Sequence, residues 1–172
     1  MAITAGFALR KEYSYLYNVL AMCTIYLGII YMEFKLHFKI KNYIKVLLII
    51  TFILHTGFGQ YFHLYTKNNW FDKGLHLFGS VAFSLFFYAV ITALINIYTS
   101  SRIFIFIVVS SIGITAGVFF ELIEFTLDIS TDSKHQHGLI DTNLDLIFNI
   151  LGAYIAGTWV IYNESPLSIK IK

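Results

Sequence analysis

Long apolar segments alternate with short polar connections along the whole chain. Five of these segments are long enough to cross ~30 Å of hydrocarbon as helices. They cover residues 15–34, 44–61, 72–98, 103–125 and 142–162. Because the connections are short, neighbouring helices should be antiparallel. The pattern predicts an all-α, polytopic transmembrane bundle of about five helices, with residues 1–172 forming a single membrane domain.

Composition agrees with a lipid environment. Of the 172 residues, 58% are apolar and 13% are charged, whereas soluble domains carry about 25% charged residues. The formal net charge is only +2, so we expect no nucleic-acid partner. Cys23 is the one cysteine, which excludes an intrachain disulfide. The first apolar segment lacks a small-x-small cleavage pattern at its end, so we expect an uncleaved membrane helix.

Lysine and arginine residues suggest an orientation, since they favour the cytoplasmic side. One side holds Arg10, Lys11, Lys67, Lys73 and Lys134, and the other holds Lys35, Lys39, Lys41, Lys45, Arg102, Lys170 and Lys172. The four lysines between the first two segments decide the comparison. We expect a multi-pass membrane protein with the N-terminus outside and the C-terminus in the cytoplasm.

Small residues four positions apart mark expected helix contacts. Gly113 and Gly117 form a G-x-x-x-G pair in the fourth segment, and Ala153 and Gly157 form a similar pair in the fifth. Such pairs let two helix backbones approach closely in a membrane. They are also common in membrane helices without any special role.

Most ionisable residues fall at the extracytoplasmic side of this topology. The acids there are Asp72, Glu121, Glu124, Asp128, Asp132, Asp141 and Asp145, and the histidines are His55, His63, His76, His135 and His137. Helical spacing places Asp72 and His76 on one face, and Asp141, Asp145 and Asn149 on another. Since antiparallel helices bring these ends to one depth, the side chains should converge. An acid inside a bilayer costs roughly 2.5–3.5 kcal/mol on insertion scales, so converging acids need a cation, a shared proton or water.

Three solutions stay open: a divalent metal, protons shared among the acids, or a cationic group. The expected metal ligands for Zn, Mn or Fe are His76, Glu121, Glu124, Asp141 and Asp145, and no other cofactor is expected. Glu121, Glu124 and Asp145 are the candidate catalytic groups. His55, Asp72, Lys73 and Asn149 are expected to support them.

Structural interpretations compete with these roles. Asp72 could cap the third helix, and Thr142 with Asp145 matches a capping box. Lys73 could pair with Asp72 or reach the interface by snorkelling. Glu121 and Glu124 are the hardest to explain in this way, because they follow a continuous apolar run and acids favour helix starts rather than ends.

The order of motifs resembles a known family. Asp72-Lys73-x-x-His76, then Glu121-x-x-Glu124, then Asp141-x-x-x-Asp145-x-x-x-Asn149-x-x-Gly152 resembles the YjdF-like family of bacterial inner-membrane proteins and, more distantly, VanZ-like proteins. The resemblance covers roughly residues 50 to 160 and implies a bacterial envelope setting. Glu124 stands where VanZ-like proteins usually carry Gln, and no clear Arg precedes Asp141, which argues against a glycopeptide-resistance role.

The leading hypothesis is a membrane protein whose acidic cluster acts, through a metal or by acid/base chemistry, on a lipid-linked or cell-envelope substrate. One rival is a proton- or cation-coupled transporter subunit, although the inner halves of the segments are almost wholly apolar. Another is a non-catalytic scaffold or modulator whose acids tie helix ends together. The sequence leaves open whether the chain is an enzyme and in what oligomeric state it works. The lipid bilayer is its expected partner.

Overall fold

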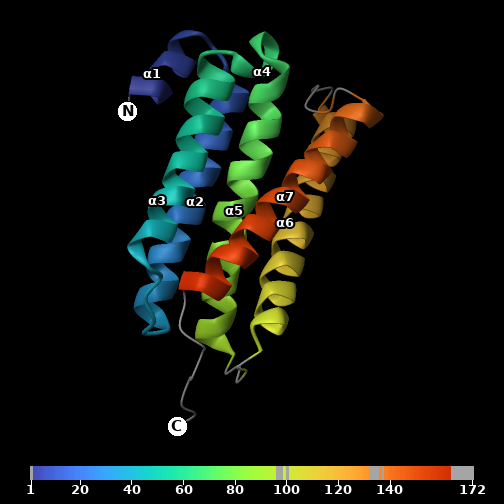
Figure 1. The fold of residues 1–172 in the computed structure, drawn as a ribbon. Helices are drawn as coiled ribbons and strands as arrows, with labels where there is room; N and C mark the ends of the chain where they lie inside the picture. Colours follow the sequence, from blue (N-terminus) through green and yellow to red (C-terminus); the bar gives the residue numbers. More distant parts are fainter. Residues whose placement is uncertain (1, 96–98, 100, 132–135, 137, 164–172) are drawn as a thin grey trace. The chain divides into compact units, whose positions relative to one another are not determined.

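The computed structural model describes residues 2–95, 99, 101–131, 136 and 138–163, and these form helices joined by short turns, without a strand (Figure 1). Five helices within these ranges are long and apolar enough to span a membrane. They are Tyr15–Lys35, Asn42–Tyr61, Asn69–Leu94, Arg102–Ser130 and Leu139–Asn163. The expected all-α bundle with five spans is therefore confirmed, while the orientation of the termini stays a prediction.

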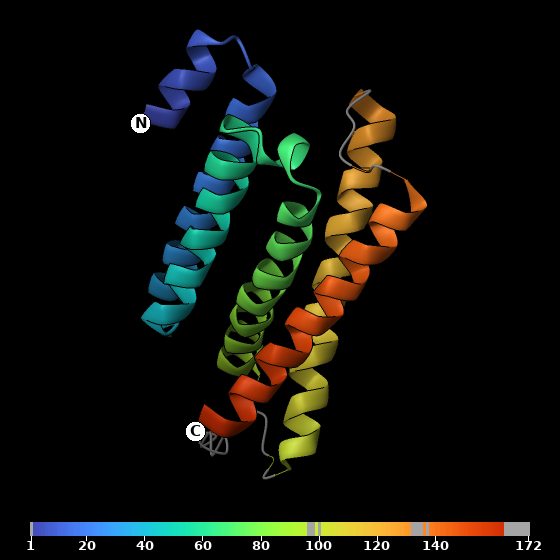
Figure 2. The same ribbon diagram turned by 45° about the horizontal axis from the view of Figure 1, so that its top comes forward.

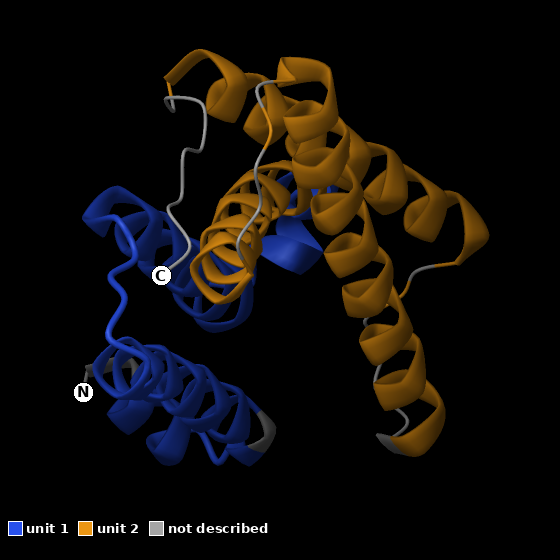
Figure 3. Ribbon diagram, turned by 90° about the horizontal axis from the view of Figure 1, so that it is seen from below, with its two compact units in different colours: residues 1–72 blue, residues 73–172 orange. Residues whose placement is uncertain are grey.

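The chain divides into two compact units, residues 1–72 and residues 73–172, which Figure 3 shows in blue and orange. The division falls inside helix α5 (Asn69–Leu94). The first turn of α5 is counted with the first unit, and the rest of the helix with the second.

The first unit contains α1 (Ala2–Leu9), α2 (Tyr13–Lys35), α3 (Asn42–Ile53), η1 (Leu54–Tyr61) and α4 (Leu64–Lys67). Helices α2 and α3 lie side by side and antiparallel (Figures 1 and 2). Glu33 fixes their connection, since its carboxylate accepts a hydrogen bond from the Ile40 backbone N–H at 2.7 Å and pairs with Lys45 at 3.2 Å. Thr56 donates to the Met22 sulfur at 3.1 Å further along the pair.

The end of the second span is a π-helix, η1, which the apolar pattern did not predict. Its sequence LHTGFGQY contains two glycines, and glycine weakens a regular α-helix. Gly59 also leaves space for the Tyr65 ring, because a Cβ at this position would lie 2.3 Å from the ring. π-Helical turns are rare and often lie at functional sites.

The second unit is built from α5, α6 (Arg102–Thr131) and α7 (Leu139–Asn163). Helices α6 and α7 form an antiparallel pair, seen in yellow to red in Figure 2. Close approach depends on small residues. A Cβ on Gly152 would lie 2.3 Å from the Leu77 carbonyl oxygen, and one on Gly113 would overlap Ser84 and Ala153. The close contacts expected from the small-residue pairs are confirmed.

Helix α6 continues to Thr131, six residues beyond its expected end at Phe125. Two hydroxyls that follow Phe125 bond within the helix: Thr126 donates to the Leu122 carbonyl at 2.7 Å and Ser130 to the Thr126 carbonyl at 2.6 Å. Polar residues therefore stay helical here, and Asp128 is part of α6. Helix α5 ends at Leu94, and residues 96–98 of the expected third span lie outside the described residues.

Large apolar side chains are exposed on every span. Examples, one from each span, are Phe34, Ile53, Leu94, Ile103 and Tyr162, all at least half exposed. Lipid solvates such side chains where water would not. The exposed surface of the helices therefore agrees with a membrane environment.

Candidate carboxylate–histidine site

Lys73 lies buried at the start of the second unit and bridges two aspartates of α7. Only 4% of its side chain is exposed. Its ammonium group bonds to Asp141 and lies 2.9 Å from Asp145 Oδ1. Asp145 is as deeply buried, whereas Asp141 is 22% exposed. The snorkelling interpretation of Lys73 is therefore wrong, and this lysine compensates charge inside the helix bundle.

His76 follows one turn later on α5, and its ring lies close to side chains of both α6 and α7. Nδ1 lies 3.6 Å from Glu121 Oε1 on α6, and Nε2 lies 3.7 Å from Asp145 Oδ1 on α7. Nδ1 also lies 3.4 Å from the Asn149 side-chain oxygen. The imidazole therefore joins acids of α6 and α7, as the helical spacing predicted.

Glu121 and Glu124 complete the α6 side of the cluster. Glu121 is buried, with 4% of the residue exposed, and Glu124 is half-buried. Together with His76 they each offer one ligand atom, and the three atoms lie within 4.8 Å of one another. Of the predicted metal ligands, these three form one group, while Asp141 and Asp145 lie on the Lys73 side.

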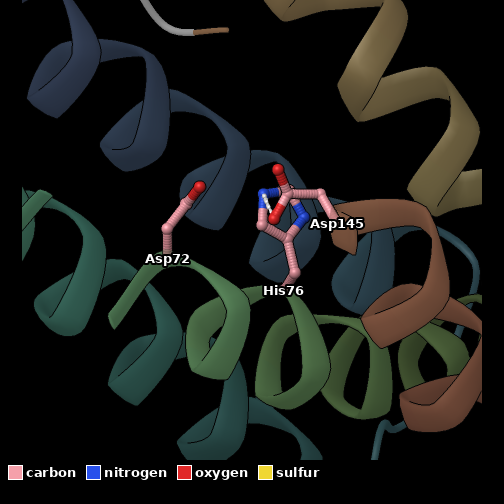
Figure 4. A group of neighbouring side chains, drawn as sticks. All are labelled: Asp72, His76 and Asp145. Atoms are coloured by element: carbon pink, nitrogen blue, oxygen red, sulfur yellow. Dashed lines mark ion pairs between the residues drawn. The ribbon is translucent and has the colours of Figure 1, made fainter. Parts of the chain in front are cut away.

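Asp72 lies one turn before His76 on the continuous helix α5, and Figure 4 shows it with His76 and Asp145. These three residues form a second group with metal-ligand potential. Asp72 is also in the first turn of α5, where a carboxylate favours the helix dipole. The position of Asp72 therefore also agrees with a structural role at the start of α5.

The capping-box interpretation of Asp145 is wrong. Helix α7 begins at Leu139, and the Thr142 backbone N–H already donates to the Gly138 carbonyl at 3.1 Å. Thr142 is therefore inside the helix rather than at its N-cap. Asp145 lies nearly two turns into α7, where it pairs with Lys73.

Asn149 sits one turn deeper, where α5, α6 and α7 meet. It is 3% exposed. Ser80 donates to its backbone carbonyl at 2.7 Å. Gly117 makes room for its amide group, because a Cβ there would lie 2.7 Å from Asn149 Cγ. The packing of three helices therefore fixes the residue that faces His76.

Gln136 is a site residue that the sequence did not reveal. Its side-chain amide donates to the Glu121 carbonyl at 3.2 Å and to Glu121 Oε2 at 3.3 Å. Its backbone N–H donates to Asp128 Oδ2 at 2.9 Å. Helical spacing cannot find a residue between two helices, and no other signal marks it. Its neighbours Asp132, Lys134, His135 and His137, expected in the same loop, lie outside the described residues.

His55 belongs to the first unit, where side chains of that unit hold its ring. Its Nε2 lies 3.0 Å from Gln60 Nε2, and its Nδ1 lies 2.5 Å from the Tyr65 hydroxyl. The expected supporting role of His55 in the acidic cluster stays a prediction.

Fold and site together define a polytopic membrane protein with a buried carboxylate–histidine cluster. The chain belongs to a family of predicted membrane proteins, DUF2238, whose profile matches residues 1–165. An uncharacterized protein of Thermotoga maritima is 36% identical over 119 residues, which cover 69% of this chain and 62% of that protein. The aligned part is thus less than two thirds of the relative's length. No solved structure matches significantly.

Proposed function

We propose that His76, Glu121 and Glu124 hold a divalent metal ion, Zn, Mn or Fe, and that the protein uses this site on a lipid-linked or cell-envelope substrate. The observation that carries the proposal is the placement of three ligand atoms within 4.8 Å of one another. They come from two helices whose neighbouring positions are apolar. Ionisable residues within membrane spans are costly and commonly mark functional sites.

The donor set fits such an ion. Imidazole suits Zn and Fe, and carboxylate oxygen suits Mn. With metal–ligand bonds of ~2.0–2.2 Å, ligand atoms of a tetrahedral site lie about 3.3 Å apart. The 3.6 Å between His76 Nδ1 and Glu121 Oε1 is near this value. Small side-chain rotations of Glu124 would bring the third atom into range.

The far side of the imidazole also fits a ligand role. A metal-binding histidine usually has its other ring nitrogen next to a carboxylate, which orients the ring. Asp145 Oδ1 occupies this position, 3.7 Å from His76 Nε2, and Lys73 holds Asp145 in place. The proposal therefore gives Asp145 an orienting role in addition to its expected role as an acid/base group.

A bound ion would act as a Lewis acid and would activate water for hydrolysis. The residues of the chain would hold and orient the ion and would accept or donate protons. Glu124 is more accessible than Glu121, so if it binds the ion through one oxygen, its second oxygen would be the better placed to accept a proton from a reacting group. Glu121 is held by Gln136 at its carbonyl and its carboxylate, which suits a fixed ligand.

The proposed setting is the extracytoplasmic face of a bacterial cytoplasmic membrane. The lysine and arginine distribution supports this orientation, and the relative from Thermotoga maritima supports a bacterial origin. The resemblance to YjdF-like and VanZ-like proteins supports an envelope role.

The scaffold is the second candidate, and the bridge between Lys73, Asp141 and Asp145 favours it. This bridge ties α5 to α7 without any ligand. A scaffold predicts that Glu121 and Glu124 also serve only to hold helices together. In that case the wild-type protein takes up no metal, and loss of these acids lowers stability.

The experiment is elemental mass spectrometry of the protein purified in detergent, after incubation with Zn, Mn or Fe(II) and removal of free ions. We expect about one ion per chain in the wild type, and less than a tenth of this in Glu121→Gln/Glu124→Gln. Glu33→Gln is the matched control, since Glu33 belongs to the first unit, where it pairs with Lys45, and it should retain the metal.

Folding is checked by size-exclusion chromatography and by thermal unfolding. If the double variant is unstable, Glu124→Gln alone replaces it, because this half-buried group is the less disruptive one to change. A wild type that stays metal-free with all three ions overturns the metal proposal. Full metal retention in a folded double variant overturns this choice of ligands.

A further inference from the structure

The N-terminal helix α1 packs onto the end of the second span in the first unit. Phe7 is fully buried, and its ring lies 5.2 Å from the Tyr15 ring and 5.4 Å from the Tyr61 ring. Gly6 leaves space for Tyr61, because a Cβ at Gly6 would lie 2.5 Å from that ring. This contact fixes where the residues that follow α1 lie.

Arg10 follows α1 and is held at Tyr61. Its guanidinium group lies 4.3 Å from the centre of the Tyr61 ring and donates a hydrogen bond to the Tyr61 carbonyl at 3.2 Å. A cation over an aromatic face is attracted by the ring. The side chain is nevertheless exposed, so Arg10 is positioned without being covered.

Lys67, which follows the second span in sequence, is anchored at the carbonyl next to the one that holds Arg10. His63 adopts a left-handed conformation, with φ of 59°, and turns the chain into α4. Lys67 at the end of α4 then donates to the Phe62 carbonyl at 2.9 Å. Since Tyr61 and Phe62 are consecutive, the two cationic groups are anchored at adjacent carbonyls.

Both cations keep hydrogen-bond donors to spare. Guanidinium has five N–H donors and ammonium has three, and within the described residues Arg10 and Lys67 each use one on a carbonyl. Neither forms an ion pair with a carboxylate there. Glu12 is the nearest acid in sequence to Arg10, and it too forms no ion pair with either residue in the described part of the chain.

The positions of Arg10 and Lys67 in the sequence are consistent with the headgroup region of a membrane. The first span begins at Tyr15 and the second ends at Tyr61, so Arg10 and Lys67 lie just beyond the membrane ends of two adjacent helices. Phe62 and Trp70 nearby in sequence are exposed. Exposed aromatic residues at such a place are typical of the headgroup region.

We propose that Lys67 and Arg10, which the Tyr61 ring holds in place, form a binding site for the phosphate of an anionic phospholipid. Arginine binds phosphate with two parallel hydrogen bonds, and lysine adds a point charge. Two held cations, neither of them paired with a carboxylate of the described residues, complement the negative headgroup of phosphatidylglycerol. Zwitterionic headgroups offset this attraction with their own positive charge. The site shares no residue with the carboxylate–histidine cluster and does not depend on the proposed function.

Native mass spectrometry tests the site. The protein in mild detergent is mixed with equal amounts of phosphatidylglycerol, phosphatidylethanolamine and phosphatidylcholine, and bound lipids are counted. We expect one preferentially bound phosphatidylglycerol in the wild type, and about tenfold less in Arg10→Gln/Lys67→Gln, because each basic residue near a lipid phosphate adds to its affinity.

Lys35→Gln/Lys39→Gln removes the same charge from exposed residues elsewhere in the first unit and should leave lipid binding unchanged. Arg10→Lys/Lys67→Arg keeps the charge and should retain the selectivity. This variant shows whether changes at the two positions are tolerated by the fold if Arg10→Gln/Lys67→Gln fails to fold. Equal binding of the three lipids to the wild type overturns the proposal. Undiminished phosphatidylglycerol binding by folded Arg10→Gln/Lys67→Gln overturns it as well.

Discussion

The two sides of His76 in the second unit are built in different ways. On the α7 side, the Lys73 ammonium bridges Asp141 and Asp145, so positive and negative groups meet in a buried bond. On the α6 side, Glu121 meets the imidazole at 3.6 Å and the neutral amide of Gln136 at 3.3 Å. The first arrangement is held together by opposite charges, whereas the second brings together side chains that could bind a metal ion.

This difference separates two uses of buried acids. A carboxylate paired with a buried lysine is costly to disturb from either partner. A carboxylate next to an imidazole can bind a cation or a proton together with that ring. We therefore expect substitutions on the α7 side to act mainly on stability, and substitutions on the α6 side to act mainly on binding.

The largest effect is expected for Lys73→Met. It leaves Asp141 and Asp145 without this cation, and breaking a buried pair from one side typically costs about 3–5 kcal/mol. Thermal unfolding in detergent should show a strongly lowered midpoint or no folded protein.

Lys73→Met/Asp145→Asn is the control for this prediction. Removing the charge of both buried partners is much less costly than removing one, so the double variant should recover part of the lost stability. A single variant as stable as the wild type would show that the bridge does not tie α5 to α7.

The second prediction concerns the packing that brings α7 to α5. In Gly152→Ala the new methyl group would lie 2.3 Å from the Leu77 carbonyl oxygen, so the helices must separate or shift. Such overpacking costs about 1–3 kcal/mol. Chemical or thermal unfolding should show this loss.

Gly74→Ala is its matched control on α5. Nothing lies within 4 Å of a Cβ at this exposed position. Alanine favours an exposed helix by up to ~1 kcal/mol over glycine, so this variant should be as stable as the wild type or more so. Equal effects of the two alanines would contradict a close α5–α7 contact at Gly152.

The sequence predicted the five spans because lipid requires long apolar segments, and it predicted the cluster because helical spacing places residues on faces. His76, Glu121 and Asp145 meet for this reason. Spacing could not tell which acid takes Lys73, since that depends on how α7 is rotated against α5. Nor could it predict η1, because a largely apolar run of this length is compatible with both a π-helix and an α-helix.

Gln136 shows most clearly what helical spacing cannot predict. Its substitution also has the smallest effect among these predictions. It lies between α6 and α7, 15 residues from Glu121, to which its amide donates at 3.2 and 3.3 Å. No helical period links the two positions. The contact is visible only in the folded structure.

Gln136→Ala tests whether this contact prepares the α6 side for an ion. A hydrogen bond contributes about 0.5–1.5 kcal/mol, so losing it should weaken metal binding about 3- to 10-fold. Competition with a metal-binding dye measures the change. Stability should fall less than in Gly152→Ala, because Gln136 is only half-buried. An unchanged metal affinity would mean that Glu121 is positioned by α6 alone. An unfolded variant would mean that Gln136 acts on stability, as the residues on the α7 side do.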